Sequence, residues 1–186
     1  SPADASERIA AIAPEAIVSL VGSVSWDEDR AFLAAEAARG SRVIAIGDVL
    51  HEASEDRLRE EPWLEAALHV FSNQDVVHFL ADERDAIEDM TVRATDGTPE
   101  RLLRKPAKTR KGSFRVPRPR HELFAANGYR FSFAHSERFA TLLSDYGCPY
   151  PCTFCVIGTL GFQTRPVADV LEEVDELRAR GVKELF

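Results

Sequence analysis

Three cysteines, Cys148, Cys152 and Cys155, place the strongest constraint on what this chain can fold into. They lie within a stretch of eight residues with the spacing CxxxCxxC, and the 186-residue chain has no other cysteine. The spacing leaves three interpretations open: an iron–sulfur cluster held by three thiolates, a structural zinc completed by a distant histidine such as His135, or three inert thiols. The number of cysteines is odd, and the first residues do not resemble a signal peptide. Both observations argue against a disulfide framework and indicate the cytoplasm.

The segments on either side of the cysteines predict a βαβ unit. Residues 138–147 are predicted to form a strand that runs directly into the cysteines. Residues 166–181 show apolar side chains at helical spacing with Gly181 as the stop, and residues 182–186 begin another strand. Such a unit opens a parallel barrel or an open sheet, in which chemistry takes place at the carboxyl ends of the strands.

The first half of the chain alternates apolar runs with helical patterns, which predicts an α/β fold with a doubly wound, Rossmann-like parallel sheet. A hairpin is expected around Asp96 and Gly97, and Pro62 is expected to break the helix that contains it. The predicted strands are 15–25, 41–48 and 75–82, and the predicted helices are 26–40, about 54–68 and 83–90.

The net charge of −8 is unevenly distributed. Residues 101–120 hold nine Lys and Arg and no acid, so the other 166 residues, with 14 basic and 31 acidic side chains, carry −17. The basic segment is interpreted either as a solvated linker that packs on the acidic body or as a contact to RNA or a phosphorylated substrate. Phe114 is its only aromatic residue, so nucleic acid is not favoured.

These patterns divide the chain into three parts. We predict a Rossmann-like domain at 1–100, a basic, proline-containing linker at 101–137 and the first βαβ unit of a second domain at 138–186. No apolar run reaches the length of a membrane span. The chain begins at Ser1 rather than Met and ends in an apolar run at Phe186, so we interpret it as a piece of a longer protein, incomplete at both ends.

The segment SDYGCPYPCTFC, with Phe154 before the last cysteine, resembles the SRGCPYxCxFC motif of the radical S-adenosylmethionine (radical SAM) superfamily. The resemblance implies that Cys148, Cys152 and Cys155 hold three irons of a 4Fe-4S cluster and that residues 138–186 start a partial (β/α) barrel. It further implies that the fourth iron binds S-adenosylmethionine (SAM), which is cleaved to a 5′-deoxyadenosyl radical. Phe154 is then expected beside the cluster and SAM, and a flavodoxin or ferredoxin is the expected electron donor.

The order of the two halves resembles the radical SAM subgroup with an N-terminal cobalamin-binding domain. Where that domain has Ser-x-Leu this chain has Ser23-Val24-Ser25, and where it has Gly-Gly this chain has Gly-Asp at Gly47. Its D-x-H-x-x-G loop is not present in the chain. The resemblance implies that Ser23, Ser25 and Gly47 contact cobalamin. His51 lies just past a predicted strand end, where a cofactor approaches a doubly wound sheet, and is interpreted either as a cobalamin contact or as a histidine of a surface loop. Trp26 is expected either to cover the corrin or to be a core residue at the start of its helix.

The sequence therefore predicts a fragment of a cobalamin-dependent radical SAM enzyme, acting on a small-molecule substrate by methyl transfer to carbon or by a related radical rearrangement or cyclisation. One alternative is a cobalamin-independent radical SAM enzyme that modifies RNA. Another is a zinc-binding module without enzymatic activity. The fragment alone is expected to be inactive, because in the family the glycine-rich segment that holds the amino group of SAM lies further along the chain.

Overall fold

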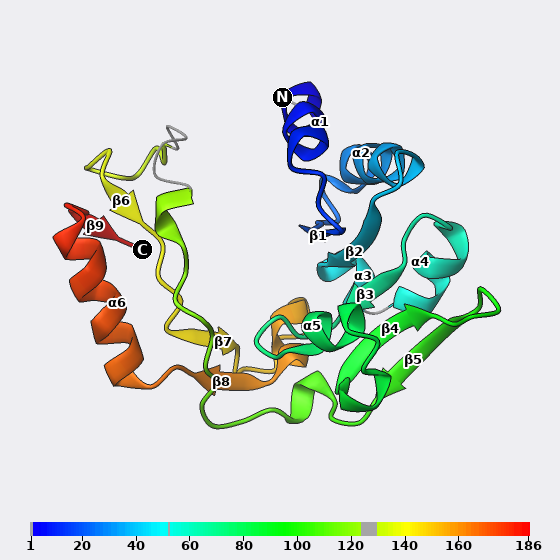
Figure 1. Cartoon of the computed structure of the whole chain (residues 1–186). Coiled ribbons are helices and arrows are strands. Elements are labelled where there is room, and N and C mark those ends of the chain that lie inside the picture. The colour runs from blue at the N-terminus through cyan, green and yellow to red at the C-terminus, as the bar shows by residue number, and fades with distance from the viewer. Residues whose placement is uncertain (1, 52, 124–129) are drawn as a thin grey trace. The chain divides into compact units, whose positions relative to one another are not determined.

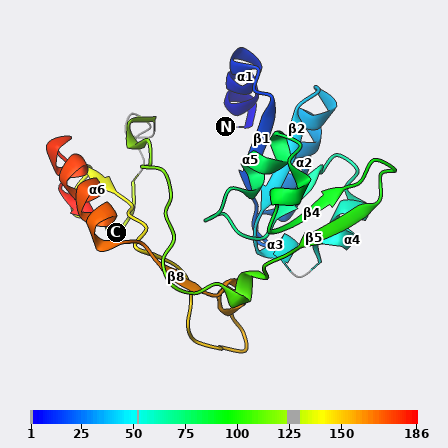
Figure 2. The ribbon, with the colours of Figure 1, turned by 60° about the horizontal axis from the view of Figure 1, so that its bottom comes forward.

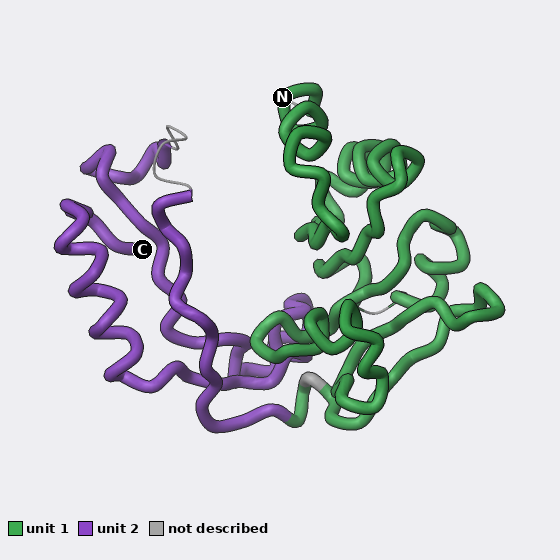
Figure 3. The backbone as a smooth tube through the Cα atoms, in the orientation of Figure 1, with its two compact units in different colours: residues 1–109 green, residues 110–186 purple. Residues whose placement is uncertain are grey.

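The computed structural model describes residues 2–51, 53–123 and 130–186. It separates into two compact units, unit 1 at residues 1–109 and unit 2 at residues 110–186 (Figure 3). Their boundary lies inside the segment predicted as a linker. None of the described helices is long and apolar enough to cross a membrane.

Unit 1 contains a five-stranded sheet whose strand order follows the chain, β1-β2-β3-β4-β5 (Figure 1). Strands β1, β2 and β3 are parallel to one another, whereas β4 is antiparallel to both of its neighbours, β3 and β5. The fold is thus α/β with a mixed sheet: the predicted parallel pairing is found for β1, β2 and β3, whereas β4 and β5 are antiparallel. The strands are β1 Ala16–Leu20, β2 Arg42–Ile46, β3 Ala66–Leu68, β4 Asp89–Arg93 and β5 Pro99–Leu103.

Both faces of this sheet are covered by apolar side chains. Val43 and Ala45 belong to one buried cluster and Ile44 to the other, because successive side chains of a strand point to opposite faces. The elements that surround the sheet are α1 Pro2–Ile12, α2 Trp26–Ala38, α3 Asp48–His51, α4 Ser54–Glu60, α5 Asp75–Leu80 and the 3₁₀ turns η1 Arg84–Ala86 and η2 Ala107–Thr109.

The predicted helix 26–40 and the hairpin at Asp96 and Gly97 are confirmed as α2 and as β4–β5. The helix predicted at 54–68 ends at Glu60, before Pro62, and β3 follows it. The strand predicted at 75–82 is wrong, because these residues form α5. Val76, Phe79 and Leu80 pack together in one core cluster, and their spacing of three and four residues is helical.

The described part of unit 2 contains two small sheets and one long helix. Strand β6 pairs with β9 in parallel and α6 lies between them in the chain, which confirms the predicted βαβ order (Figure 1). The single strand predicted at 138–147 is wrong, because β6 and β7 belong to different sheets and β7 pairs antiparallel with β8. The elements are η3 His121–Leu123, β6 Phe139–Ala140, β7 Asp145–Gly147, η4 Val156–Leu160, β8 Phe162–Thr164, α6 Val167–Ala179 and β9 Glu184–Leu185.

Candidate functional site

The three cysteines lie on one loop, residues 148–161, which we call the cysteine loop. Strands β7 and β8 close its base, where Gly147 pairs with Phe162 and the Cys148 N–H donates to the Gly161 carbonyl at 2.9 Å. The 3₁₀ turn η4 forms its second half, and the loop extends away from α6 (Figure 2). The sequence thus places all three thiols between two paired strands.

Two glycines allow this loop to close. Gly147 has φ +83°, and a Cβ atom there would lie 1.9 Å from the Gly161 carbonyl oxygen. A Cβ atom on Gly158 would lie 2.9 Å from the Tyr150 carbonyl oxygen. Any other residue at Gly147 would be strained and would also collide with the opposite strand. The glycine just before the first cysteine therefore has a backbone role in the loop.

The donor set of this loop suits a cluster held by three thiolates. None of the three cysteines forms a disulfide; Cys148 and Cys155 are half-buried and Cys152 is exposed. Within the described residues, however, no three His, Cys, Asp or Glu side chains converge as a metal site. The chemistry of the donors fits the cluster, but binding of the metal would have to bring the three sulfurs together.

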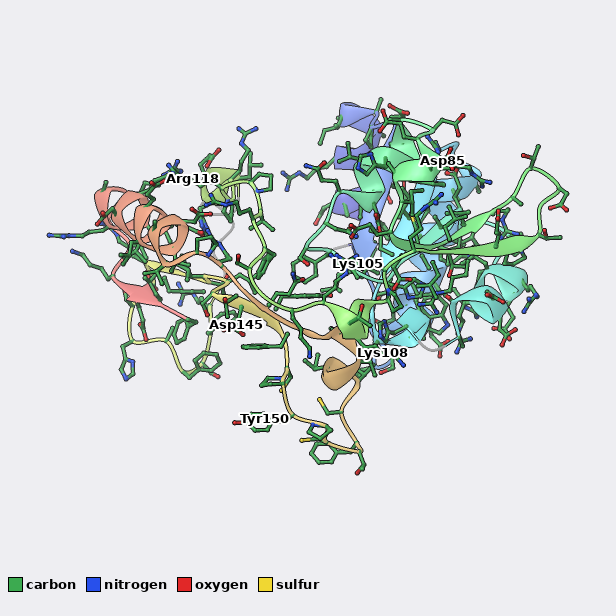
Figure 4. All side chains as sticks on the ribbon, turned by 90° about the horizontal axis from the view of Figure 1, so that it is seen from below. Asp85, Lys105, Lys108, Arg118, Asp145 and Tyr150 are labelled. Carbon is green, nitrogen blue, oxygen red and sulfur yellow. The ribbon has the colours of Figure 1, made fainter. Side chains whose placement is uncertain are left out.

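The aromatic side chains of the loop point into solvent. Phe154 is 90% exposed and Tyr150 is 69% exposed, and Tyr150 projects from the loop (Figure 4). The predicted position of Phe154 beside the cluster and SAM therefore stays a prediction. His135, the residue considered for a zinc site, has its Nδ1 3.2 Å from a carboxylate oxygen of Glu184.

In unit 1, the predicted cobalamin residues lie after β1 and β2. The Ser23 N–H and hydroxyl donate to the Asp48 carboxylate at 2.9 and 2.7 Å, and the bond from this hydroxyl lowers the pKa of Asp48. A Cβ atom on Gly47 would lie 1.7 Å from the Val21 carbonyl oxygen, so glycine lets the two strand ends approach. The structure thus brings Ser23 and the Gly47 turn together.

Two other predicted residues of this region have local partners. The Ser25 hydroxyl donates to the Asp29 carboxylate at 2.7 Å, within the first turn of α2. Trp26 is buried in the core and its ring centroid lies 6.4 Å from that of Trp63. Of the two roles considered for Trp26, the core role is the one that the structure shows.

The sequence reasoning missed His69, which follows β3 at the same carboxyl edge of the sheet. The residue is 1% exposed, and its Nε2 lies 3.0 Å from the Thr91 hydroxyl, which in turn bonds the Ser54 hydroxyl at 2.7 Å. The centroid of the His51 ring lies 5.7 Å away. Burial, the charge of Arg101 and the neighbouring His51 lower the pKa of His69 to about 3, so the ring is neutral at physiological pH.

The only signal for His69 in the sequence is its position directly after a short apolar run, Ala66–Leu68, that was read as part of a helix. The Nδ1 atom of His69 is buried and has no hydrogen-bond partner among the described residues. His51, which the sequence did single out, lies beside it at the end of α3. The carboxyl edge of the parallel strands therefore carries a histidine pair, one member of which is fully buried.

The basic segment 101–120 packs against acidic side chains, as the first of its two interpretations expects. Five of its arginines form ion pairs with acidic residues of their own unit. These pairs are Arg101–Asp89, Arg104–Asp85, Arg115–Asp169, Arg118 with Glu172 and Glu176, and Arg120–Glu122. Much of the local positive charge is thus neutralised by the protein itself.

Sequence comparison finds relatives for part of the chain. The ribosomal protein uS12 methylthiotransferase RimO of Alteromonas mediterranea is 37% identical over 77 residues, and that of Dechloromonas aromatica is 41% identical over 70 residues. The matches cover 38% and 37% of this chain, but only 15% of each relative. No family model matches the chain.

A comparison with solved structures covers almost the whole chain. The cobalamin-dependent S-adenosylmethionine radical enzyme OxsB has a similar fold, with a TM-score of 0.70 over 97% of this chain and 25% of the OxsB chain, at 14% sequence identity. Taken together, the comparisons relate this chain to the radical SAM enzymes, which confirms the resemblance of the cysteine motif. At that identity, the likeness to OxsB in particular is one of fold.

Proposed function

We propose that this chain is part of a cobalamin-dependent radical SAM enzyme of the cytoplasm that transfers a methyl group to carbon or carries out a related radical rearrangement or cyclisation on a small molecule. The observation that carries the proposal is a single loop with three free cysteines, closed by β7 and β8, in a chain related to radical SAM enzymes. A 4Fe-4S cluster, when bound, supplies the electron for the reductive cleavage of SAM.

In this proposal the cysteine loop holds and orients the cluster. Cys148, Cys152 and Cys155 provide three thiolates, and the chain offers no fourth cysteine. The β7–β8 pairing fixes the two ends of the loop, and Gly147 permits the close approach of those ends. The open coordination position that results is the one that SAM would take, with Phe154 beside it, and a flavodoxin or ferredoxin would deliver the electron.

The carboxyl edge of β1, β2 and β3 is the part of unit 1 that would hold cobalamin. Ligands of open α/β sheets bind at the carboxyl ends of parallel strands. Ser23, Ser25, Gly47 and His51 lie at this edge, and the fold of the whole chain is similar to that of a cobalamin-dependent enzyme. The buried Nδ1 atom of His69, which has no hydrogen-bond partner among the described residues, adds a polar group to the same edge.

The partial similarity to RimO favours a second candidate function, group transfer to a macromolecule without cobalamin. RimO is by name a methylthiotransferase that acts on a ribosomal protein, and it matches this chain more closely in sequence than OxsB does. An RNA substrate is less favoured, because the arginines of the basic segment are paired with acids. The two candidates differ in whether the chain retains a corrin.

Cobalamin retention separates the two candidates. The full 186-residue chain, mixed with hydroxocobalamin and passed through a desalting column, is expected to retain about one corrin per chain, with changes in the corrin absorbance. Gly47→Val, which places bulk where a Cβ atom already meets the Val21 carbonyl, should abolish retention. Glu100→Val, at an exposed position of β5 near the opposite edge of the sheet, should leave it unchanged. Absence of retention by the folded chain would favour the RimO-like candidate.

A further inference from the structure

The first residues of the segment 110–122, which we call the strap, bond to β8 beside the base of the cysteine loop. The Phe162 N–H donates to the Arg110 carbonyl at 3.1 Å and the Thr164 N–H to the Gly112 carbonyl at 2.9 Å. The Phe114 N–H donates back to the Thr164 carbonyl at 3.1 Å, and Ser113 bridges Thr164 in parallel. Strand β8 is therefore held on both edges, by β7 and by the strap.

Phe114 anchors this first part of the strap. Its side chain is buried, and its ring meets the buried ring of Tyr146 edge-on at a centroid distance of 6.3 Å. Tyr146 belongs to β7, and its partner in β8 is Gln163. The anchor thus packs the strap against both strands that close the cysteine loop.

The second part of the strap is fastened to α6 by charge. Arg115 donates to both carboxylate oxygens of Asp169 at 3.0 Å, and Arg118 reaches Glu172 at 2.9 Å and Glu176 at 3.0 Å. Arg118 lies alongside α6 (Figure 4). The acids recur at spacings of three and four residues and therefore share one face of the helix.

Two further pairs extend this fastening to the end of the strap. His121 Nε2 lies 2.8 Å from Glu173, whose other oxygen accepts a hydrogen bond from the buried Arg165 at 2.7 Å. Glu122 accepts a hydrogen bond from Arg180 at 3.0 Å, and the bonds from Arg120 and Arg180 lower the pKa of Glu122 to about 2. The strap and α6 are thus joined along most of the length of the helix.

We propose that the strap is a positioning element for the cysteine loop and that the ion pairs on α6 act as a clasp that keeps it in place. Arg115 and Arg118 are largely exposed, so each pair is weak and is screened by salt. When the clasp opens, β8 loses the support of the strap on one edge, and the base of the loop loosens. This inference adds a supporting element to the proposed cluster site, and its relevance to catalysis rests on the proposed function.

Amide hydrogen exchange of the full 186-residue chain without metal tests the clasp. Arg118→Glu replaces attraction to Glu172 and Glu176 by repulsion, so the Phe162 and Thr164 amides, which bond the strap directly, should exchange roughly fivefold faster, as expected for the loss of about 1 kcal/mol. The Cys148 amide at the loop base should accelerate as well. The same acceleration should follow when the salt concentration is raised for the unsubstituted chain.

Two variants serve as controls for a local effect. Arg178→Glu makes the same charge change on an exposed residue of α6 and should leave these amides unchanged. Combining Arg118→Glu with Glu172→Arg restores one pair in reverse and keeps the Glu176–Arg180 pair, so it should slow exchange again. The amide of Leu177, inside α6, should be unaffected in every variant, which distinguishes release of the strap from general unfolding of unit 2.

Exchange at Phe162, Thr164 and Cys148 that is the same in Arg118→Glu as in the unsubstituted chain would overturn the proposal. So would equal acceleration by Arg178→Glu, or failure of the reversed pairing to rescue. Because the measurement reads the chain without metal, it is independent of cluster assembly. A chain with a working clasp that takes up no iron would refute the proposed function but not the strap, and the converse result would refute the strap alone.

Discussion

Units 1 and 2 differ in the kind of contact that holds each together. In unit 1, two clusters of nine and seven buried apolar residues cover the two faces of the sheet. In the described part of unit 2, the buried apolar residues are Phe114, Ala140, Tyr146 and Leu177, and the buried polar ones are Arg110, Gln163, Arg165 and Glu173. Unit 1 therefore has an apolar core of its own, whereas the described part of unit 2 has few buried apolar side chains and combines ion pairs with contacts among exposed and half-buried phenylalanines. In our proposal, unit 2 also depends on the iron–sulfur cluster.

The largest loss of stability in unit 2 is expected when Glu173 is replaced. Its carboxylate is 1% exposed and compensates the charge of Arg165, whose side chain is 3% exposed. Glu173→Ala leaves that charge buried without its partner and should destabilise unit 2 by about 3–5 kcal/mol. Hydrogen exchange of the α6 amides in increasing denaturant measures this loss.

Tryptophan fluorescence provides the control for this prediction. Both tryptophans of the chain, Trp26 and Trp63, lie in or against a core cluster of unit 1. Their unfolding transition should not move in Glu173→Ala. Glu172→Ala, at an exposed position of the same helix, should cost less than about 1 kcal/mol. Equal effects of the two substitutions would mean that the buried pair does not hold unit 2 together.

Unit 1 should be most sensitive to loss of apolar volume. Leu58 is fully buried in a core cluster, and Leu58→Ala is expected to lower the free energy of unfolding by about 2–5 kcal/mol. Urea unfolding followed by tryptophan fluorescence measures the change. Leu20→Ala, at a residue that is 79% exposed, should change it by no more than about 0.5 kcal/mol. A small effect of Leu58→Ala would contradict an apolar core in unit 1.

Acid should destabilise unit 1 through His69. The pKa of His69 is about 3 in the folded chain and 6.5 without its surroundings, so below pH 6.5 the unfolded chain takes up a proton that the folded chain does not. The contribution of the neutral His69 to the free energy of unfolding is therefore fully present above pH 6.5. It falls by about 1.4 kcal/mol per pH unit as the pH decreases toward 3. The measurement is the tryptophan-monitored free energy of unfolding at several pH values.

The substitution His69→Gln isolates this contribution. Glutamine can still bond the Thr91 hydroxyl, but it does not titrate. In the variant, the free energy of unfolding should therefore fall less steeply as the pH decreases, by a slope that corresponds to the uptake of about one proton fewer on unfolding. An unchanged slope would show that His69 is protonated in the folded chain as readily as in the unfolded one.

The smallest expected effect is that of the exposed ion pairs of unit 2. Arg115→Ala removes the pair with Asp169 and should cost up to about 1 kcal/mol at low salt and almost nothing at about 1 M salt. Exchange of the α6 amides measures the cost under both conditions. A cost that does not change with salt would indicate that Arg115 contributes by packing rather than by charge.

The sequence predicted those elements whose periodicity is regular over many residues. Helix α6 follows from apolar spacing and from Gly181 as its stop, α2 from its alanine-rich composition and the acids of its first turn, and the β4–β5 hairpin from the turn residues Asp96 and Gly97. Strand β3 was missed because Ala66–Leu68 is too short to show a pattern, and α5 was misread because Val76 and Val77 favour strands locally. In the structure, these residues are helical because Val76, Phe79 and Leu80, at helical spacing, pack into one core cluster.

The candidate site was predicted unevenly for a similar reason. The three cysteines form a local motif, so their common loop follows from the sequence. The position of His69 depends on Thr91, which lies 22 residues further along, and the strap depends on acids of α6 that lie more than 50 residues away from their partners. Neither long-range pairing can be read from local periodicity, although the charge pattern did indicate that the basic segment packs on acids.

The central claim is that three thiolates hold a cluster with one open iron, and electron paramagnetic resonance tests it most directly. The full 186-residue chain, reconstituted with iron and sulfide without air and then reduced, should give the signal of a 4Fe-4S cluster, and added SAM should change that signal. Cys152→Ala should abolish it. A chain that binds zinc instead of iron, or a cluster whose signal does not respond to SAM, would contradict the claim.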